Sequence, residues 1–283
     1  MKIVTYNIQY SRGQDDRFDL PRVAAAIQDA DIIGLQEVDR YWKRTGMQDQ
    51  AAALAELLPG RYWVFAGGYD VAAALPPGAD PQAMGRRRQH GNMILSRWPI
   101  LSFRTLRLPR GNPGEVWAQD RVLLEGIIDA PGGALRIYVT HLCHIGPHTR
   151  LPQVDYTLGL FGSLPADGPT WSGEHIHGDY WNDGDSAIPY PDELLWMGDL
   201  NFTPDSEEYA KVIAGGLQDS WALAGHDPLA AESFTLRSMH PPHLEKRLDQ
   251  IFVSPSLAPR VKSAWVDQAT LASDHFPAWL ELR

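Results

Sequence analysis

The order of the predicted secondary-structure elements indicates an α/β fold. Within the first 38 residues, an apolar run, a stretch with apolar side chains at helical spacing and a second apolar run follow one another. A strand, a helix and another strand in succession are typical of an α/β domain. Farther along, two apolar runs are joined by Pro131, Gly132 and Gly133, which predicts a β-hairpin. No linker or repeat interrupts the chain, so we expect a single domain over residues 1–283.

The same patterns place the other elements along the chain. Strands are predicted where short apolar runs end at polar or turn residues, and these runs cover residues 3–8, 31–38, 91–100, 121–129, 135–142, 194–197, 248–254 and 278–282. Helices are predicted from helical spacing and capping residues, over residues 21–29, 48–58 and 152–161 and from Ser206 onward. Residues 67–91 are rich in glycine, proline and arginine, so we expect them to form a loop.

Composition restricts the classes of protein to which the chain can belong. A chain of 283 residues can bury a large core, and 44% hydrophobic with 21% charged residues is ordinary for a soluble globular protein. Cys143 is the single cysteine, which excludes an intrachain disulfide and suits a reducing compartment. No apolar run is long enough to span a membrane and no signal-peptide pattern is visible. We therefore expect a cytoplasmic protein.

The formal net charge is −10, which argues mildly against nucleic acid as the favoured partner. Phosphate backbones are usually bound by basic surfaces, although a bound divalent cation can offset a carboxylate-rich cleft. The arginine run Arg86, Arg87 and Arg88 has two interpretations. It is either a solvated part of a loop or a cationic feature that meets an anionic substrate at the mouth of a cleft.

The stretch from residue 194 to residue 204 organises the chain. Its apolar beginning predicts a core strand, and Gly198 allows close backbone approach where this strand ends. Asp199 and Asn201 follow at once. A carboxylate and an amide two residues apart at a strand end can face one pocket on an α/β scaffold. The same pair could also merely cap a turn and the next helix.

Polar side chains recur at the ends of other apolar strands. In a sandwich of two sheets, such ends can converge on one cleft. Carboxylate oxygens favour Mg²⁺ or Mn²⁺ over Zn²⁺, and histidines can neutralise charge that develops on phosphate oxygens. The candidate site residues are Asn7, Glu37, His141, Asp199, Asn201, Asp249, Asp274 and His275.

These residues lie in seven short motifs that together resemble the endonuclease/exonuclease/phosphatase superfamily of metal-dependent phosphohydrolases. The motifs follow one another in the family's order along nearly the whole chain. They are residues 5–8 (TYNI), 34–38 (GLQEV), 91–97 (GNMILSR), 140–142 (THL), 198–201 (GDLN), 247–253 (RLDQIFV) and 273–275 (SDH). The resemblance implies a DNase-I-like four-layer α/β sandwich, in which two mostly antiparallel sheets pack face to face with helices outside.

The resemblance also implies roles on the metal side of the site. Glu37 would bind Mg²⁺ or Mn²⁺ directly, with Asn7 beside it, and Asp274 would belong to the same side. Asp199 would orient or deprotonate the attacking water, and Asn201 would help to hold the phosphate and the water.

The remaining implied roles concern the phosphate. His275 would contact the scissile phosphate as an acid/base or as an electrostatic stabiliser, with Asp249 fixing its tautomer and charge. His141 would be a second phosphate-facing histidine. Arg121 matches a position where the family often has a basic residue near the phosphate. Repair enzymes similar to exonuclease III usually have a tyrosine in place of His141, so this histidine argues against abasic-site repair.

Residues 145–193 are a longer segment than compact members of the family carry at this position. We consider a plain surface loop, or a lid whose side chains stack on the substrate. The candidate lid residues are Trp171, His175, His177, Tyr180 and Trp181. A third interpretation is a second metal site formed by His175, His177 and Asp179, which share one face if the chain is extended there.

The function predicted from the sequence is metal-dependent hydrolysis of a phosphate ester, most consistent with a phosphodiesterase or phosphatase acting on a small-molecule or lipid phosphate. One alternative is a nuclease that cleaves DNA or RNA. Another is a non-catalytic binding module that keeps the fold; the complete polar set argues against it, because the metal and histidine residues should be lost first. The sequence does not identify the substrate or the oligomeric state.

Overall fold

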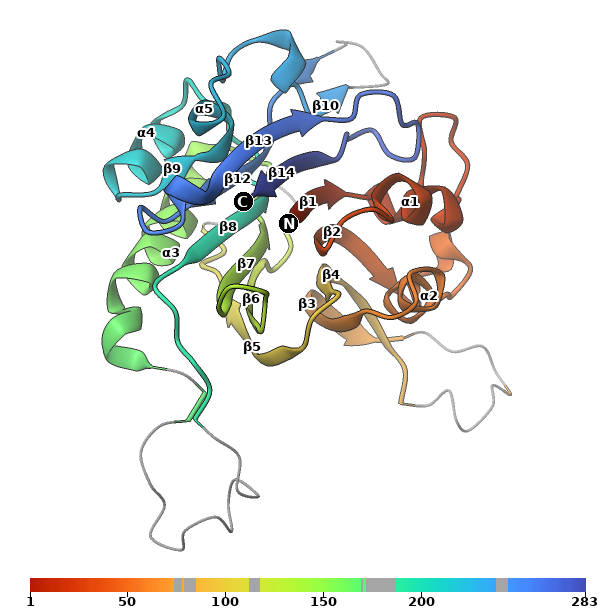
Figure 1. The fold of residues 1–283 in the computed structure, drawn as a ribbon. Coiled ribbons are helices and arrows are strands. Elements are labelled where there is room, and N and C mark those ends of the chain that lie inside the picture. Colours follow the sequence, from red (N-terminus) through yellow and green to blue (C-terminus); the bar gives the residue numbers. More distant parts are fainter. Residues whose placement is uncertain (74–77, 79–84, 112–117, 169, 172–186, 238–243) are drawn as a thin grey trace, which may run out of the picture.

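The computed structural model describes the chain except residues 74–77, 79–84, 112–117, 169, 172–186 and 238–243. Two six-stranded sheets form its centre (Figure 1). The first has the order β13-β14-β1-β2-β4-β3 and consists of β1 (Lys2–Asn7), β2 (Ile32–Arg40), β3 (Tyr62–Ala72), β4 (Arg87–Ser96), β13 (Val261–Val266) and β14 (Ala278–Leu282). The second has the order β5-β6-β7-β8-β12-β9 and consists of β5 (Ile100–Arg107), β6 (Val122–Ile128), β7 (Leu135–His141), β8 (Leu194–Asp199), β9 (Gln218–Asp219) and β12 (Asp249–Val253). A further two-stranded sheet consists of β10 (Leu236–Arg237) and β11 (Glu245–Lys246).

Each large sheet has one parallel pair of strands at its middle. Strand β1 runs parallel to β2, and β7 runs parallel to β8, whereas the other neighbouring strands of both sheets are antiparallel. The carboxyl ends of two parallel strands meet at the same edge of a sheet. This brings Asn7, at the end of β1, next to Gln36 of β2, and it brings His141 next to Asp199.

The helices begin at capping residues or prolines that the sequence makes visible. Helices α1 (Leu20–Ile27) and α2 (Gln50–Leu57) follow Asp19 and Asp49, whose carboxylates each accept a hydrogen bond from a backbone amide of the first turn. Ser206 caps α4 (Glu207–Ala214) in the same way. The other described helices are α3 (Pro147–Asp167) and the short α5 (Ser220–Leu223).

Three hydrophobic clusters define four layers. The cluster between the sheets combines residues of both, such as Ile3 and Ile94 with Val139 and Met197. A second cluster packs α1 and α2 against the outer face of the first sheet, and a third packs α3 and α4 against the outer face of the second. Figure 1 shows these two groups of helices on opposite sides of the molecule. The predicted four-layer sandwich is thus confirmed.

Most predicted elements are confirmed with small shifts of their ends, but the expected loop over residues 67–91 is partly wrong. Strand β3 occupies its beginning up to Ala72, and β4 begins at Arg87. The sequence also fails to predict β5 and β13, and the two-residue strands β9, β10 and β11. Strands β3, β5 and β13 lie at a sheet edge, where exposed side chains weaken the apolar pattern on which strand prediction depends.

Helix α3 is also longer than predicted. It extends beyond residues 152–161 at both ends, so the segment expected as an insertion over residues 145–193 begins as a helix. Its partly buried Leu158 and Phe161 pack against the outer face of the second sheet.

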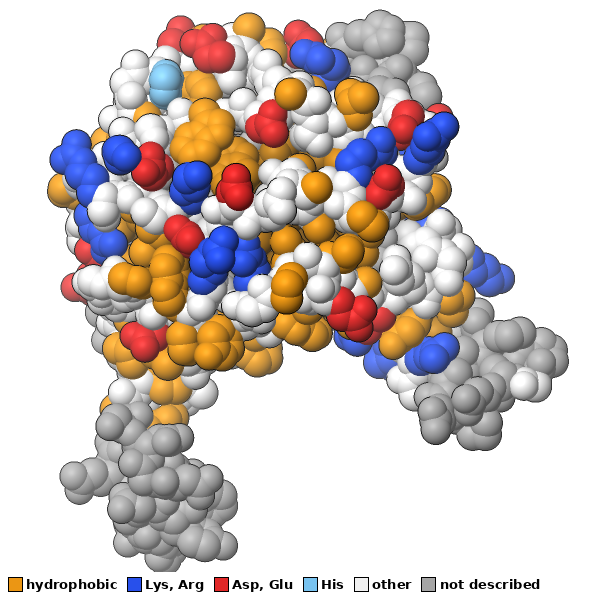
Figure 2. All heavy atoms as spheres, turned by 45° about the vertical axis from the view of Figure 1, so that its right-hand side comes forward, with side chains coloured by type: hydrophobic (Ala, Val, Ile, Leu, Met, Phe, Trp, Pro, Cys, Tyr) orange, Lys and Arg blue, Asp and Glu red, His pale blue; other side chains and the backbone are white. Residues whose placement is uncertain are grey.

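No helix among the described residues combines the length and hydrophobicity needed to cross a bilayer. On the face shown in Figure 2, acidic and basic side chains are interspersed with hydrophobic ones.

Gly198 allows β8 to deliver Asp199 to the edge of the sheet. Its φ of 149° lies in the region that favours glycine, and a Cβ atom at this position would lie 1.8 Å from the carbonyl oxygen of Thr140 on β7. The close approach keeps the parallel pairing intact up to the pair formed by His141 and Asp199. Gly198 therefore fixes the position of the residue that follows it.

Candidate active site

The predicted site residues from the two sheets meet at one edge of the sandwich. Strand β12 runs antiparallel to β8, so Asp249 at its start pairs with Asp199 at the end of β8. His275 lies in the segment before β14 and forms an isolated bridge with Leu236. The carboxyl ends of β7 and β8 and the amino end of β12 meet at this edge, so residues far apart in the sequence have neighbouring side chains there.

Asn7 links the two sheets through its side-chain amide. Its Nδ2 donates a hydrogen bond to Glu37 Oε1 at 3.2 Å and another to Asp199 Oδ2 at 2.9 Å. Its Oδ1 accepts the backbone N–H of Gln9 at 3.0 Å. The side-chain nitrogen of Asn7 therefore holds the carboxylates of Glu37 and Asp199 next to each other, while its side-chain oxygen is hydrogen-bonded to the backbone of Gln9.

Glu37 adopts an unusual backbone conformation for its residue type. Its φ is 60°, and the pairing between β2 and β4 shifts between Leu35 and Val38. Such a bulge re-aims a side chain at a cost in backbone strain. The carboxylate of Glu37 consequently points to the site from within β2, which continues to Arg40 and does not end there as the sequence suggests.

Asp249 and His275 form a buried acid–imidazole pair. His275 Nδ1 lies 2.7 Å from Asp249 Oδ2, and the backbone N–H of Asp249 donates to Thr235 Oγ1 at 2.9 Å. Burial disfavours the charged imidazole, but the negative charges of Asp249 and Asp199 outweigh it, so the pKa of His275 lies well above its usual value. His275 Nε2 faces Asp199 Oδ2 at 3.8 Å.

Asp199 is the central carboxylate of this arrangement. Burial raises its pKa to about 7, and the nearby charges of Asp249 and Glu37 act in the same direction, against the effect of His275. Its Oδ1 accepts the backbone N–H of Asn201 at 3.1 Å. Asn201 has a φ of 54°, and its side-chain nitrogen donates a hydrogen bond to the carbonyl of Leu142. The side-chain oxygen of Asn201 therefore points away from Leu142.

His141 lies between the carboxylates of both sheets. Its Nε2 is 3.2 Å from Asp199 Oδ2 and its Nδ1 is 3.9 Å from Glu37 Oε1. Nδ1 is buried and makes no hydrogen bond with any described residue. Burial, together with the charge of Arg121, holds the pKa of His141 well below its usual value. The surroundings therefore shift the pKa values of His141 and His275 in opposite directions, although both rings face Asp199.

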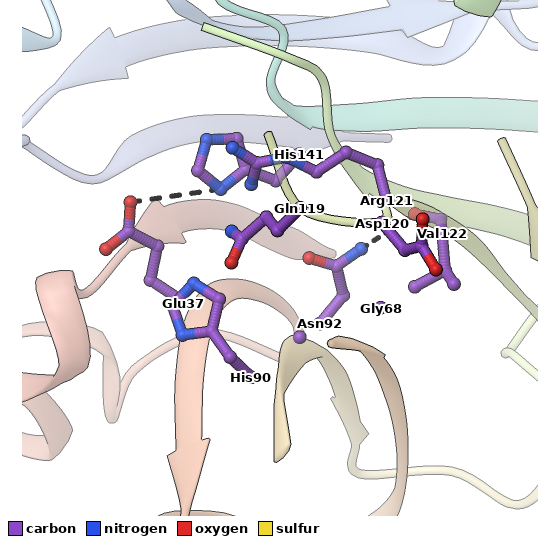
Figure 3. A pocket seen from close by; sticks show the side chains of 10 residues that line it. Glu37, Gly68, His90, Asn92, Gln119, Asp120, Arg121, Val122 and His141 are labelled. Carbon is purple, nitrogen blue, oxygen red and sulfur yellow. Dashed lines mark hydrogen bonds and ion pairs between the residues drawn. The ribbon is translucent and has the colours of Figure 1, made fainter. Parts of the chain in front are cut away.

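Figure 3 shows a pocket beside this cluster, into which side chains from both sheets point. The first sheet contributes Glu37, His90 and Asn92, and the second contributes His141 with Arg121, just before β6. Arg121 is buried, its Nε has no described partner, and burial lowers its pKa. The expected basic residue thus lines the pocket.

Three further residues at the site were not predicted from the sequence. Asn92 donates to the carbonyl of Val122 in the opposite sheet at 3.0 Å, and His90 lies two residues before it on β4. Gln9 donates its side-chain amide to Asp274 Oδ2 at 2.9 Å. His90 and Asn92 are polar residues at alternate positions of a buried strand, a signal that the sequence contains; nothing in the sequence marks Gln9.

The donor atoms present suit a hard divalent cation. Asp199, Asp249 and His275 offer ligand atoms that all lie within 4.8 Å of one another, and Asp249 Oδ1 is buried without a described hydrogen-bond partner. Burial also raises the pKa of Asp274, with the charge of Glu37 adding to the effect. Mutual repulsion of this kind is relieved by a bound cation.

The compact cluster differs from the set that the resemblance implied for the metal, namely Glu37, Asn7 and Asp274. Asp249 of the compact cluster is already hydrogen-bonded to His275, which suits a role in orienting the imidazole. The Glu37 side chain is 21% exposed, whereas that of Asp199 is buried, and Asn7 donates hydrogen bonds to both. The position of Glu37 therefore suits the metal-binding role that the resemblance implies for it.

The lid residues His175, His177, Tyr180 and Trp181, with the second metal site that includes Asp179, lie outside the described residues. Trp171 is described and is partly buried. Whether this segment closes over the site stays a prediction.

Asp199 is expected to make the stability of the metal-free protein depend on pH. A carboxyl group whose pKa rises from 3.8 to about 7 on folding stabilises the fold below pH 3.8, and this contribution is lost as the pH rises through 7. Urea denaturation with chelator present should show the unfolding free energy of the wild type falling relative to that of Asp199→Asn across this interval. The exposed Asp29→Asn serves as control, and a pH-independent difference for Asp199→Asn would contradict the expectation.

Known proteins share this architecture. A structure of an endonuclease/exonuclease/phosphatase from Beutenbergia cavernae DSM 12333 has a TM-score of 0.68 at 21% identity, covering 100% of this chain and 71% of that one. A mannosyl-6-phosphatase from Bacteroides thetaiotaomicron VPI-5482 gives 0.66 at 20% identity, covering 100% and 99%. Humanized D. rerio TDP2 gives 0.61 at 15% identity, covering 100% and 98%. At such identities the likeness shows the fold alone.

A sequence search of curated proteins gives no match. The model of the Endonuclease/Exonuclease/phosphatase family, in contrast, matches residues 4–275, which include every residue of the site built above. The chain therefore belongs to the endonuclease/exonuclease/phosphatase family.

Proposed function

We propose that this protein is a divalent-metal-dependent hydrolase of phosphate esters, a phosphodiesterase or phosphatase acting on a small-molecule or lipid phosphate. The observation that carries the proposal is the position of Asp199. This buried carboxylate lies 2.9 Å from Asn7 Nδ2, 3.2 Å from His141 and 3.8 Å from His275. A proton-accepting oxygen among donors of this kind suits the attack of water on phosphorus.

In this mechanism Asp199 orients the attacking water and takes its proton, for which a pKa near the working pH is favourable. His275, kept charged by Asp249, counters the negative charge that develops on the phosphoryl oxygens. Glu37, with Asp274 and Asn7 alongside, would hold Mg²⁺ or Mn²⁺. When bound, the cation supplies Lewis acidity that polarises a phosphoryl oxygen or stabilises the leaving oxygen.

Two further residues position the phosphate. Arg121 lines the pocket next to His141, and its buried guanidinium lacks a partner for Nε. The side-chain nitrogen of Asn201 donates to the carbonyl of Leu142, and its side-chain oxygen, which makes no hydrogen bond with a described residue, can orient water. Both assignments agree with the roles that the family resemblance implies.

The fold of a mannosyl-6-phosphatase and that of TDP2 are both similar to this chain, so the fold does not choose between small-molecule phosphates and nucleic acid. We favour a small-molecule or lipid phosphate because the net charge of −10 disfavours general binding to a phosphate backbone. Cleavage of a nucleic acid stays as the alternative.

The test is hydrolysis of bis(p-nitrophenyl) phosphate, a diester, beside p-nitrophenyl phosphate, a monoester. Each is assayed with Mg²⁺, with Mn²⁺ and with chelator, and His275→Gln is compared with the exposed His226→Gln. We expect metal-dependent turnover that His275→Gln abolishes and His226→Gln retains. Preference for the monoester would indicate a phosphatase and preference for the diester a phosphodiesterase.

Equal turnover with chelator and with metal would contradict metal dependence. If neither ester is cleaved, single-stranded and double-stranded DNA and RNA are tested next. Mn²⁺ binding without turnover of any of these substrates would favour the non-catalytic binding module.

A further inference from the structure

The arginine run of residues 86–88 is divided between the two faces of the first sheet. Arg87 pairs with Asp70 on the same face on which Gln89 contacts Arg40. Side chains alternate along a strand, so Arg88 lies on the face of His90, whose ring enters the site pocket (Figure 3). The sequence allowed two interpretations of the arginine run, a solvated loop or a cationic feature at the mouth of a cleft. The exposed Arg87 fits the first, whereas Arg88 does not.

Arg88 belongs to a cluster of two guanidinium groups and three aromatic rings, Tyr10, Trp42, Arg44, Tyr69 and Arg88, which we call the Trp42 platform. The guanidinium of Arg44 lies 3.8 Å from the ring centroid of Tyr10 and 4.2 Å from that of Trp42. The guanidinium of Arg88 lies 5.0 Å from the Trp42 ring and 5.7 Å from the Tyr69 ring. Stacking on aromatic faces orients a guanidinium and leaves its N–H edge free for an anion.

Arg44 is held by a buried carboxylate that also holds His90. Its Nε and Nη2 donate to Asp39 at 2.8 and 2.9 Å. Asp39 is fully buried and lies 2.7 Å from His90 Nδ1. The position of Arg44 is therefore coupled rigidly to that of His90, a residue of the pocket wall.

Arg88 has no such acidic partner. Its Nη2 donates to the hydroxyl of Tyr69 at 3.0 Å, and its Nε is buried without a hydrogen-bond partner among the described residues. No described carboxylate lies within ion-pair distance of it. Of the two guanidinium groups on Trp42, only that of Arg44 is paired with a described carboxylate, that of Asp39, so the Trp42 platform keeps one positive charge, on Arg88, without a described ion-pair partner.

The Trp42 platform adjoins the reaction centre. Glu37 and Asp39 are alternate residues of β2, and His90 lines the same pocket as Glu37. Burial acts to lower the pKa of Arg44, but the bonds to Asp39 and the charges of Asp39, Tyr10 and Glu37 outweigh this effect and raise it. Arg44 is therefore linked through Asp39 and His90 to the pocket that Glu37 lines.

We propose that the Trp42 platform is a second anion-binding subsite, which binds a phosphate or carboxylate group of the substrate other than the scissile phosphate. The inference rests on the proposed function and narrows it: the substrate is a phosphate ester with at least two anionic groups. Arg88 supplies the positive charge that has no described ion-pair partner, and Arg44, fixed by its bonds to Asp39, forms the other side of the subsite. The anion can belong to a soluble bisphosphate or to the headgroup of a phosphorylated lipid.

The test measures binding, so it does not require turnover. The probes are alkane bisphosphonates of increasing chain length, with alkane monophosphonates of matched length as references, titrated calorimetrically in the presence of Mg²⁺. For the best chain length, Arg88→Met should lower the ratio of bisphosphonate to monophosphonate affinity by roughly ten- to a hundredfold, as expected for loss of a charged hydrogen bond. The matched control is Arg87→Met, which removes the neighbouring charge from the opposite face and should leave the ratio unchanged.

Two results would overturn the proposal: an unchanged ratio in Arg88→Met, or an equal fall of the ratio in Arg87→Met. Vesicles of phosphatidylcholine with and without a phosphoinositide identify the source of the anion. Retention that requires both the phosphoinositide and Arg88 assigns the subsite to a lipid headgroup, and lack of retention assigns it to a soluble bisphosphate. If no ester is hydrolysed but the ratio still depends on Arg88, the proposed hydrolase fails and the subsite stands.

Discussion

Asp199→Asn is expected to lower turnover by roughly 10²–10⁴-fold, the usual contribution of a positioned acid–base group. The amide cannot take a proton from water. Its NH2 group would also replace one of the two oxygens that now accept hydrogen bonds, from Asn7 Nδ2 at 2.9 Å and from the backbone N–H of Asn201 at 3.1 Å. The measurement is the turnover number on the better p-nitrophenyl ester at saturating metal, together with a thermal melt that verifies folding.

The control for Asp199→Asn is Asp29→Asn, an exposed change of the same chemical kind. We expect it to leave turnover within a factor of two or so, as most surface substitutions do. If Asp199→Asn folds normally and retains near-normal turnover, the proton is taken elsewhere, and the proposed role of Asp199 is wrong.

Glu37→Gln is expected to weaken metal binding and turnover together. A change beside a metal ligand typically costs 10- to 100-fold in affinity, and loss of a ligand charge should cost at least about as much. The affinity for Mn²⁺ is measured by following the free ion by electron paramagnetic resonance, which needs no substrate. Turnover at fixed metal should fall in parallel, and excess metal should restore part of it.

Two comparisons make the Glu37 experiment decisive. Glu56→Gln, an exposed change, should alter neither quantity. Asp249→Asn removes a carboxylate of the compact cluster that also contains Asp199 and His275. If Asp249→Asn weakens Mn²⁺ binding more than Glu37→Gln does, the metal belongs to that cluster and the assignment at Glu37 must be abandoned.

Several features of the fold and site were predictable from the sequence because they depend on local chemistry. The central strands are continuous apolar runs, since they are buried on both faces, and each ends at a polar residue. Asp199 is the last residue of β8, and Asp249 is the first residue of β12. The order of seven short motifs then sufficed to indicate the family.

Edge strands and connecting residues were not predictable in this way. Strand β3 carries mostly exposed or partly exposed side chains, so its sequence does not differ from that of a loop. Gln9 contacts Asp274 across the whole length of the chain, a contact that no local pattern encodes.

By itself, then, the sequence determined the fold class and the candidate site residues that the structure brings together, because burial and strand termination leave local patterns. The tertiary structure alone decided how those residues are coupled. It decided that Asn7 spans two carboxylates with its nitrogen, and that Asp249 is committed to His275. It also separated Arg88 from Arg87, because strand pairing places consecutive residues on opposite faces, and which face meets the pocket depends on partners distant in the sequence.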